Sequence, residues 1–247
     1  MAQPDVVVGR VSGEHWAGRL YQRHLSIYVT RLLIPTAVTP DMVTWLMFPL
    51  GIGAALVMTI PHVWAAVVAV VLIQLQGLFD CVDGELARWR ERSSPSGVFL
   101  DRLGHYVTDA SLAAAVGVRA GGGLGQLAGW TSIGLATACL VLLTKAETDL
   151  VLVARYQSGR ERLPDERETA APRGGLLRRL RRFIAVMPIN RALLAMEVTL
   201  LVTLAAVIDA AGAAPHATRA LSVALLAVAG FVVVARLPSI LTSARLR

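Results

Sequence analysis

Acidic side chains recur at helical spacing in a chain that is otherwise strongly apolar. Asp80 and Asp83 lie three residues apart, so their carboxylates share one face of a helix. Asp101, His105 and Asp109 repeat every four residues on the face of a second helix. Converging carboxylates repel one another unless a cation neutralises them, and hard oxygen ligands select Mg²⁺, Mn²⁺ or Ca²⁺. The spacing therefore predicts a divalent-cation site at which Asp80, Asp83 and Asp101 meet.

The helices that carry these groups are predicted to lie in a membrane. The 247 residues are 55% hydrophobic and only 6% aromatic, with a mean hydropathy of +0.59, which is more apolar than an ordinary soluble domain. A helix needs roughly 20 mostly apolar residues to cross the hydrocarbon. Six such stretches are expected, at 42–60, 63–82, 99–118, 128–153, 192–210 and 217–236. The predicted fold class is therefore all-α integral membrane, with six transmembrane helices.

The positive charges predict the orientation of these spans. The net charge is +7 and the pI about 10.4, but the arginines cluster between apolar segments, which indicates membrane topology and no nucleic-acid partner. The N-terminal segment, the 88–92 loop, the long loop at about 155–191 and the C-terminus are basic, and the connections between them carry little positive charge. Both termini are therefore expected to be cytoplasmic, in a multi-pass protein of the inner (plasma) membrane.

The chain divides into three predicted parts. Residues 1–40 are a cytoplasmic segment in which 15–34 mix apolar side chains with Arg and His at helical spacing, as in an amphipathic helix lying at the membrane interface. Residues 41–236 form the six-span domain, and 237–247 form a cytoplasmic tail. A second interfacial helix is possible at 176–183, where four arginines can face anionic headgroups.

The acidic pattern resembles that of the CDP-alcohol phosphotransferase family, also called CDP-alcohol phosphatidyltransferases. That pattern is Asp-x2-Asp-Gly-x2-Ala-Arg, then eight or nine residues, then Gly-x3-Asp-x3-Asp. The entry to the first span, from Thr39-Pro40-Asp41 to Thr44, is also similar, with Thr39 as the expected N-cap. The positions of the main pattern are occupied here, in chain order, by Asp80, Asp83, Gly84, Ala87, Arg88, Gly97, Asp101 and His105.

The resemblance implies an enzyme with the same six-helix membrane fold. Such an enzyme moves a phosphate-linked alcohol, phosphatidyl or polyol phosphate, from a CDP-activated donor to an alcohol or a phosphorylated polyol or lipid acceptor, and it releases CMP. Two divalent cations, Mg²⁺ or Mn²⁺, are implied on the aspartates. A homodimer among membrane lipids is also implied. The CDP moiety is expected beside the metals, on Gly84, Ala87, Arg88, Gly97 and Thr44.

His105 is the one departure from the family pattern. The family has Asp there, usually assigned as the base that deprotonates the acceptor hydroxyl. Histidine can act both as a base near neutral pH and as a nitrogen ligand. His105 is therefore expected to be the base and the fourth metal ligand, with Asp101 as its catalytic neighbour. Asp109, one turn further along the same face, is the alternative base.

Several interpretations stay open beside this one. The site at His105 can have decayed, leaving a membrane scaffold, or the acids can form an ion path in a transporter. Lys145 can donate to an acceptor phosphate or pair with Asp149 four residues on. Glu85 is expected to face away from the aspartates and is left outside the site. The sequence Asp-Gly-Glu-Leu-Ala-Arg is similar to that of the polyol-phosphate branch of the family, which includes di-inositol phosphate phosphate synthases.

Overall fold

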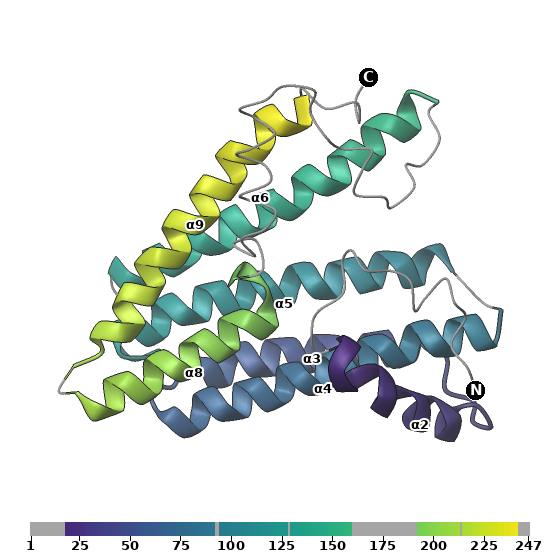
Figure 1. The fold of residues 1–247 in the computed structure, drawn as a ribbon, viewed down its shortest axis with the longest axis horizontal. Coiled ribbons are helices and arrows are strands. Elements are labelled where there is room, and N and C mark those ends of the chain that lie inside the picture. The colour runs from purple at the N-terminus through teal and green to yellow at the C-terminus, as the bar shows by residue number, and fades with distance from the viewer. Residues whose placement is uncertain (1–17, 92–93, 128, 160–191, 213, 242–247) are drawn as a thin grey trace.

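The protein is built from helices. The computed structural model describes residues 18–91, 94–127, 129–159, 192–212 and 214–241, and the regular elements within them are seven α-helices and one short π-helix (Figure 1). They are η1 (Gly18–Gln22), α2 (Arg23–Leu33), α3 (Pro40–Met58), α4 (Val63–Trp89), α5 (Pro95–Gly121), α6 (Gly129–Gln157), α8 (Ala195–Ala211) and α9 (His216–Leu241). The predicted all-α class is confirmed.

The six long helices coincide in order and position with the six predicted spans. Three of them are apolar enough over sufficient length to cross a membrane: Pro40–Met58, Val63–Trp89 and, within α9, His216–Pro238. The chain is thus a membrane protein with several apolar helices. η1 and α2 occupy the predicted interfacial helix. Predictions about 1–17, most of the 155–191 loop and the end of the tail fall outside the described residues.

A side-chain hydroxyl caps the N-terminus of both α3 and α5. Thr39 caps α3 by accepting from the backbone N–H of Met42 at 3.3 Å, which confirms the predicted N-cap. Ser94 caps α5 in the same way by accepting from Gly97 N–H at 2.9 Å. A cap of this kind stabilises a helix by about 1 kcal/mol. The cap at Ser94 starts α5 before the predicted apolar stretch, so Gly97 lies in its first turn.

α4 continues to Trp89, past the predicted end of the span at 82. The acidic residues lower the hydropathy there, but they do not end the helix, because Val82 and Leu86 are completely buried. The whole acidic motif therefore sits on the last turns of one helix and the first turns of the next.

The helices pack closely where side chains are small. α3, α4 and α5 pack together, α6 lies against α5 and α9, and α8 contacts α4 and α9 (Figure 1). α5 and α6 cross at Gly117 and Gly134. A Cβ at Gly117 would lie 2.4 Å from the carbonyl oxygen of Trp130, and one at Gly134 would lie 2.7 Å from that of Ala114. Glycine is needed at both positions because any side chain would push the helices apart.

Candidate active site

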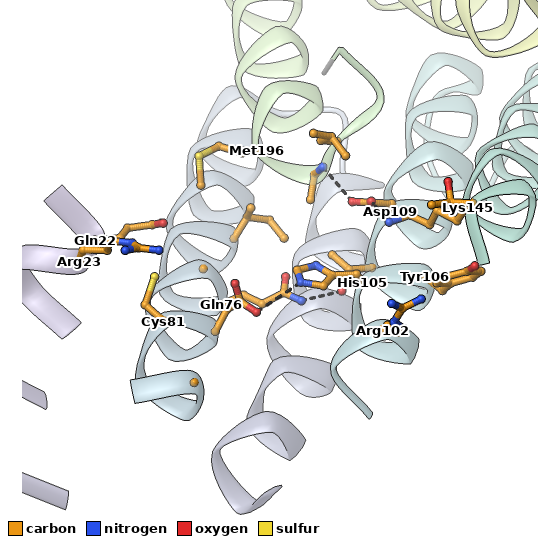
Figure 2. A pocket seen from close by; sticks show the side chains of 18 of the residues that line it. Gln22, Arg23, Gln76, Cys81, Arg102, His105, Tyr106, Asp109, Lys145 and Met196 are labelled. Atoms are coloured by element: carbon orange, nitrogen blue, oxygen red, sulfur yellow. Dashed lines mark hydrogen bonds and ion pairs between the residues drawn. The ribbon is translucent and has the colours of Figure 1, made fainter. Parts of the chain in front are cut away.

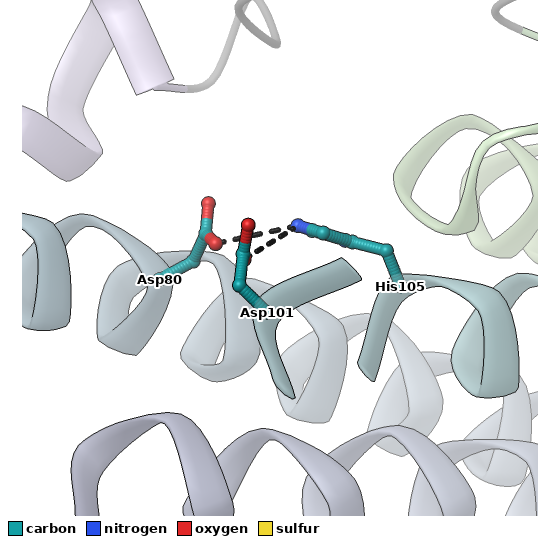
Figure 3. Close-up of side chains that lie close together, drawn as sticks. All are labelled: Asp80, Asp101 and His105. Carbon is teal, nitrogen blue, oxygen red and sulfur yellow. Dashed lines mark ion pairs between the residues drawn. The ribbon is translucent and has the colours of Figure 1, made fainter. Parts of the chain in front are cut away.

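Three of the four predicted metal ligands come together. Asp80 of α4 meets Asp101 and His105 of α5 (Figure 3), with His105 Nε2 3.3 Å from Asp80 Oδ1 and 3.5 Å from Asp101 Oδ1. One ligand atom from each residue lies within 4.8 Å of the others. Their side chains are 35–43% exposed, so a solute can reach them. Two carboxylates and an imidazole are a donor set that suits a divalent cation.

Asp83, the fourth predicted ligand, points elsewhere. It is 9% exposed and accepts a hydrogen bond from Thr44 Oγ1 of α3, with 2.7 Å between Oδ2 and Oγ1. Three residues turn an α-helix by about 300°, so Asp83 is rotated by about 60° from Asp80. That offset directs it toward α3 instead of α5. Thr44, predicted to contact the donor, is itself 3% exposed and bonded to Asp83.

A cavity of about 690 Å³ opens beside the cluster (Figure 2). Asp80, Gly84, Arg88 and His105 are among the residues that line it. A Cβ at Gly84 would lie 3.2 Å from Arg88 Nη1, so the glycine lets the guanidinium approach the helix backbone. Ala87 and Gly97, which were also predicted to contact the donor, are not part of the described lining.

Gly97 has a different neighbour, Asp41 at the start of α3. A Cβ at Gly97 would lie 3.0 Å from Asp41 Oδ1. Ser94 Oγ donates to the same carboxylate at 3.3 Å. The small residue therefore allows the first turn of α5 to contact the first turn of α3.

The far wall of the cavity contains a buried ion pair. Asp109 of α5 is 5% exposed; it accepts from Lys145 Nζ of α6 at 2.7 Å and from the backbone N–H of Ala195 at 2.9 Å. One carboxylate thus joins α5, α6 and α8. The Lys145–Asp149 pair weighed from the sequence does not form, because Lys145 has this buried partner on a neighbouring helix.

Asp149 bonds to α5 instead. It pairs with Arg102 and accepts from Tyr106 Oη at 3.0 Å. Lys145 Nζ also lies 5.5 Å from the centre of the Tyr106 ring. Sequence reasoning missed this polar ladder between α5 and α6. Its signal was present, because Arg102, Tyr106 and Asp109 follow one another at i, i+4 and i+7.

Glu85 lies outside the cluster of Asp80, Asp101 and His105, as predicted, but it is among the residues that line the cavity. Its carboxylate accepts from Ser26 Oγ at 2.6 Å and from Thr30 Oγ1 at 2.7 Å. Both hydroxyls belong to α2. Glu85 therefore joins the N-terminal helix to the helix that carries Asp80.

Known proteins share both the sequence pattern and the fold. The family model for CDP-alcohol phosphatidyltransferase matches residues 37–244. A bifunctional IPC transferase and DIPP synthase of Thermococcus kodakarensis is 36% identical over 103 residues, 41% of this chain and 23% of that protein. Its namesake in Rubrobacter xylanophilus is 35% identical over 121 residues, 49% and 26% of the respective chains. The matches thus span about a quarter of the length of these curated relatives.

Two solved structures of phosphatidylinositol phosphate synthase from Mycobacterium tuberculosis have a similar fold. The apo form is 19% identical with a TM-score of 0.53, covering 87% of this chain and 96% of the other. The complex with manganese and citrate is 18% identical with a TM-score of 0.54, covering 89% and 90%. At these identities the likeness shows the fold. Because the family model matches most of its length, this chain belongs to the CDP-alcohol phosphatidyltransferase family of membrane enzymes.

Proposed function

We propose that this enzyme transfers a phosphate-linked alcohol, phosphatidyl or polyol phosphate, from a CDP-activated donor to an alcohol acceptor and releases CMP. The observation that carries the proposal is the convergence of Asp80, Asp101 and His105 beside a cavity that Arg88 also lines. A cation site and a guanidinium at one cavity suit a diphosphate. The alternatives of a decayed scaffold or a transporter explain neither the position of Arg88 nor that of Gly84.

Asp80, Asp101 and His105 would hold a divalent cation, Mg²⁺ or Mn²⁺, and Asp83 would hold a second one by giving up its hydrogen bond to Thr44. When bound, such cations neutralise a diphosphate and stabilise the leaving phosphate oxygen. The manganese complex of the M. tuberculosis enzyme supports this assignment by family likeness. His105 replaces a carboxylate of the family pattern, so we expect the ion nearest to it to be held less tightly.

The side chains of the protein would do the remaining work. Arg88 would bind the donor diphosphate, with Gly84 keeping the helix backbone close to it. The acceptor oxygen forms a bond to the phosphorus that carries the alcohol, the bond to the CMP phosphate oxygen breaks, and the hydroxyl proton passes to His105. Asp80 and Asp101, 3.3 and 3.5 Å from Nε2, would then hold the imidazolium by ion pairing.

The distribution of positive charge and the family likeness support a proposal for the topology and oligomeric state. We propose six spans with the site open to the cytoplasm, both termini on that side of the inner (plasma) membrane, and a homodimer. The acceptor is proposed to carry a phosphate of its own, because one similar fold is a phosphatidylinositol phosphate synthase and a polar ladder containing Lys145 and Arg102 faces the cavity.

The test is CMP release by the purified protein. CDP-diacylglycerol and CDP-polyol donors are each supplied with phosphorylated and unphosphorylated polyols, in Mg²⁺ or Mn²⁺. We expect turnover with one donor class, loss of turnover in EDTA, and loss in Asp101→Asn. Arg31→Lys, at an exposed arginine outside the described cavity lining, is the control. Absence of CMP release with every donor would refute the transfer reaction, and undiminished turnover in EDTA would refute the metal assignment.

A further inference from the structure

The N-terminal helix α2 presents its polar side to the protein. Gln22, Ser26 and Thr30 follow one another at intervals of four and are 3%, 0% and 2% exposed. Four large side chains of η1 and α2 face outward and are 51–73% exposed, at Leu20, Leu25, Tyr28 and Leu32. A helix on a soluble protein has the opposite arrangement. Val29 and Leu33 of α2 pack against the buried cluster of Val43, Val82 and Leu86, so polar contacts hold α2 together with this apolar packing.

These contacts form a seam along α4. Gln22 Nε2 donates to the carbonyl oxygen of Gln74 at 3.3 Å and to its Oε1 at 3.1 Å. A Cβ at Gly77 would lie 2.7 Å from Gln22 Nε2, so glycine permits the close approach. Further along, Ser26 and Thr30 donate to the two oxygens of Glu85 at 2.6 and 2.7 Å. Glu85 is thus the charged anchor of the seam.

The seam forms part of the cavity wall. Gln22 and Arg23 of η1 and α2 line it together with Gly84 and Arg88 of α4 (Figure 2). Arg23 is adjacent in sequence to the buried Gln22, and its position depends on where α2 sits. Glu85 also lines the cavity, but its carboxylate belongs to neither the metal cluster nor the ladder on α6. Its hydroxyl donors, Ser26 and Thr30, both belong to α2, so the carboxylate helps to hold this helix.

We propose that Glu85 is a positioning residue, which fixes α2 through Ser26 and Thr30 so that Arg23 stands in the cavity beside Arg88 and binds the donor diphosphate. This rests on the proposed function. Removal of one hydroxyl leaves a carboxylate oxygen without that donor. A hydrogen bond to a charged group is equivalent to about tenfold or more in an equilibrium constant.

The test compares two changes at Thr30. Thr30→Ser keeps the hydroxyl, whereas Thr30→Val keeps the shape and removes it. Arg90 donates to the carbonyls of Leu33 and Ile34 at 3.3 and 3.4 Å, so the end of α2 stays attached in either variant. Tyr28→Phe, on the exposed side of α2, is the matched control.

Cys81 supplies a readout that needs no substrate. Gly77, Cys81 and Glu85 are spaced four apart on α4, and the first and last contact Gln22 of η1 and Ser26 of α2, so Cys81 lies on the same face of α4 between these contacts. In a Cys139→Ala background, we expect Thr30→Val to react with a maleimide about three- to tenfold faster at Cys81. Thr30→Ser and Tyr28→Phe should react at the rate of the parent.

Kinetics supply the second readout. We expect Thr30→Val and Arg23→Gln to raise the KM for the CDP donor by about three- to tenfold with kcat little changed, because Arg23→Gln removes the proposed contact with the diphosphate and Thr30→Val displaces Arg23 from it. Thr30→Ser and Arg23→Lys should restore the KM. A loss of kcat at unchanged KM in Thr30→Val would overturn the proposal.

The labelling and the kinetics separate this proposal from the function it rests on. If Thr30→Val matches Thr30→Ser in Cys81 labelling, Glu85 does not position α2. If Thr30→Val exposes Cys81 but Arg23→Gln leaves the KM unchanged, the diphosphate role of Arg23 is wrong. If the parent protein releases no CMP from any donor, the proposed function fails and the role of Arg23 fails with it, while Cys81 labelling still decides the role of Glu85.

Discussion

Neutralising Asp109 should lower the free energy of unfolding of the protein without removing its catalytic base. Asp109 is 5% exposed and bound to Lys145 and to the N–H of Ala195, which leaves it occupied by structural partners. In Asp109→Asn the amide oxygen can still accept from Ala195, but Lys145 loses its carboxylate. Lys145 is 21% exposed and partly solvated. We therefore expect Asp109→Asn to lower the free energy of unfolding by about 2–3 kcal/mol. This is at the lower end of, or just below, the effect of removing one partner from a fully buried ion pair.

The reverse change should cost more. Lys145→Met leaves the nearly buried Asp109 carboxylate without its cation, at about 3–5 kcal/mol. The double variant Asp109→Asn/Lys145→Met contains no uncompensated charge, so it should be more stable than the sum of the two single changes by about 1–3 kcal/mol. Reversible unfolding of the parent and the three variants in mixed detergent micelles gives the four free energies of unfolding that this double-mutant cycle needs.

Lys145 also reports on the pair chemically. It is the only lysine in this sequence. Besides the N-terminal amine, an amine-reactive ester therefore labels Lys145 alone, and we expect faster labelling in Asp109→Asn because the ammonium is no longer held. CMP release per folded molecule should stay within about tenfold of the parent. A variant of unchanged stability and unchanged labelling that has lost turnover would refute this reasoning and make Asp109 the base.

Three further predictions test the site. Asp83→Asn should abolish CMP release, because it removes the carboxylate proposed for the second cation, and should leave membrane insertion intact, because it keeps the packing volume; retained turnover would exclude Asp83 from cation binding. Ser96→Cys, in a background without Cys81 and Cys139, should react with an impermeant maleimide only from the cytoplasm, and periplasmic reaction would overturn the topology. His105→Ala should be nearly inactive and His105→Asp partly active; near-normal turnover in His105→Ala would exclude His105 as the base.

Residues whose relation is fixed by one helix were predictable. The four-residue interval between Asp101 and His105 sets them on one face whatever surrounds them, and the structure has both beside Asp80. The order and approximate extent of the six long helices follow from hydropathy for the same reason, since each is a local property. The start of α3 at Thr39 was also readable, because capping involves only neighbouring residues.

Relations between helices were not predictable to the same degree. Helical geometry alone gives the rotation of about 60° between Asp80 and Asp83. Whether this rotation directs Asp83 out of the cluster depends on the position of α3, which supplies its partner Thr44. Lys145 had a feasible partner on its own helix in Asp149, and only the packing of α6 on α5 offers it Asp109. Glu85 could be excluded from the cluster by helical geometry, yet its partners on α2 lie more than fifty residues away in sequence.

The geometry of His105 limits how it can serve in both of its proposed roles, as metal ligand and as base. Nε2 faces both carboxylates, and an imidazole nitrogen carries either a proton or a lone pair. As a donor to Asp80 and Asp101, Nε2 has no lone pair for a cation; as a ligand, it cannot hold the acceptor's proton. A carboxylate at this position has two oxygens and can serve both tasks at once. The histidine therefore takes the proton on Nδ1 while Nε2 binds the cation, separates the roles in time, or leaves one of them to Asp101, which is why the family's aspartate and this histidine are not chemically equivalent.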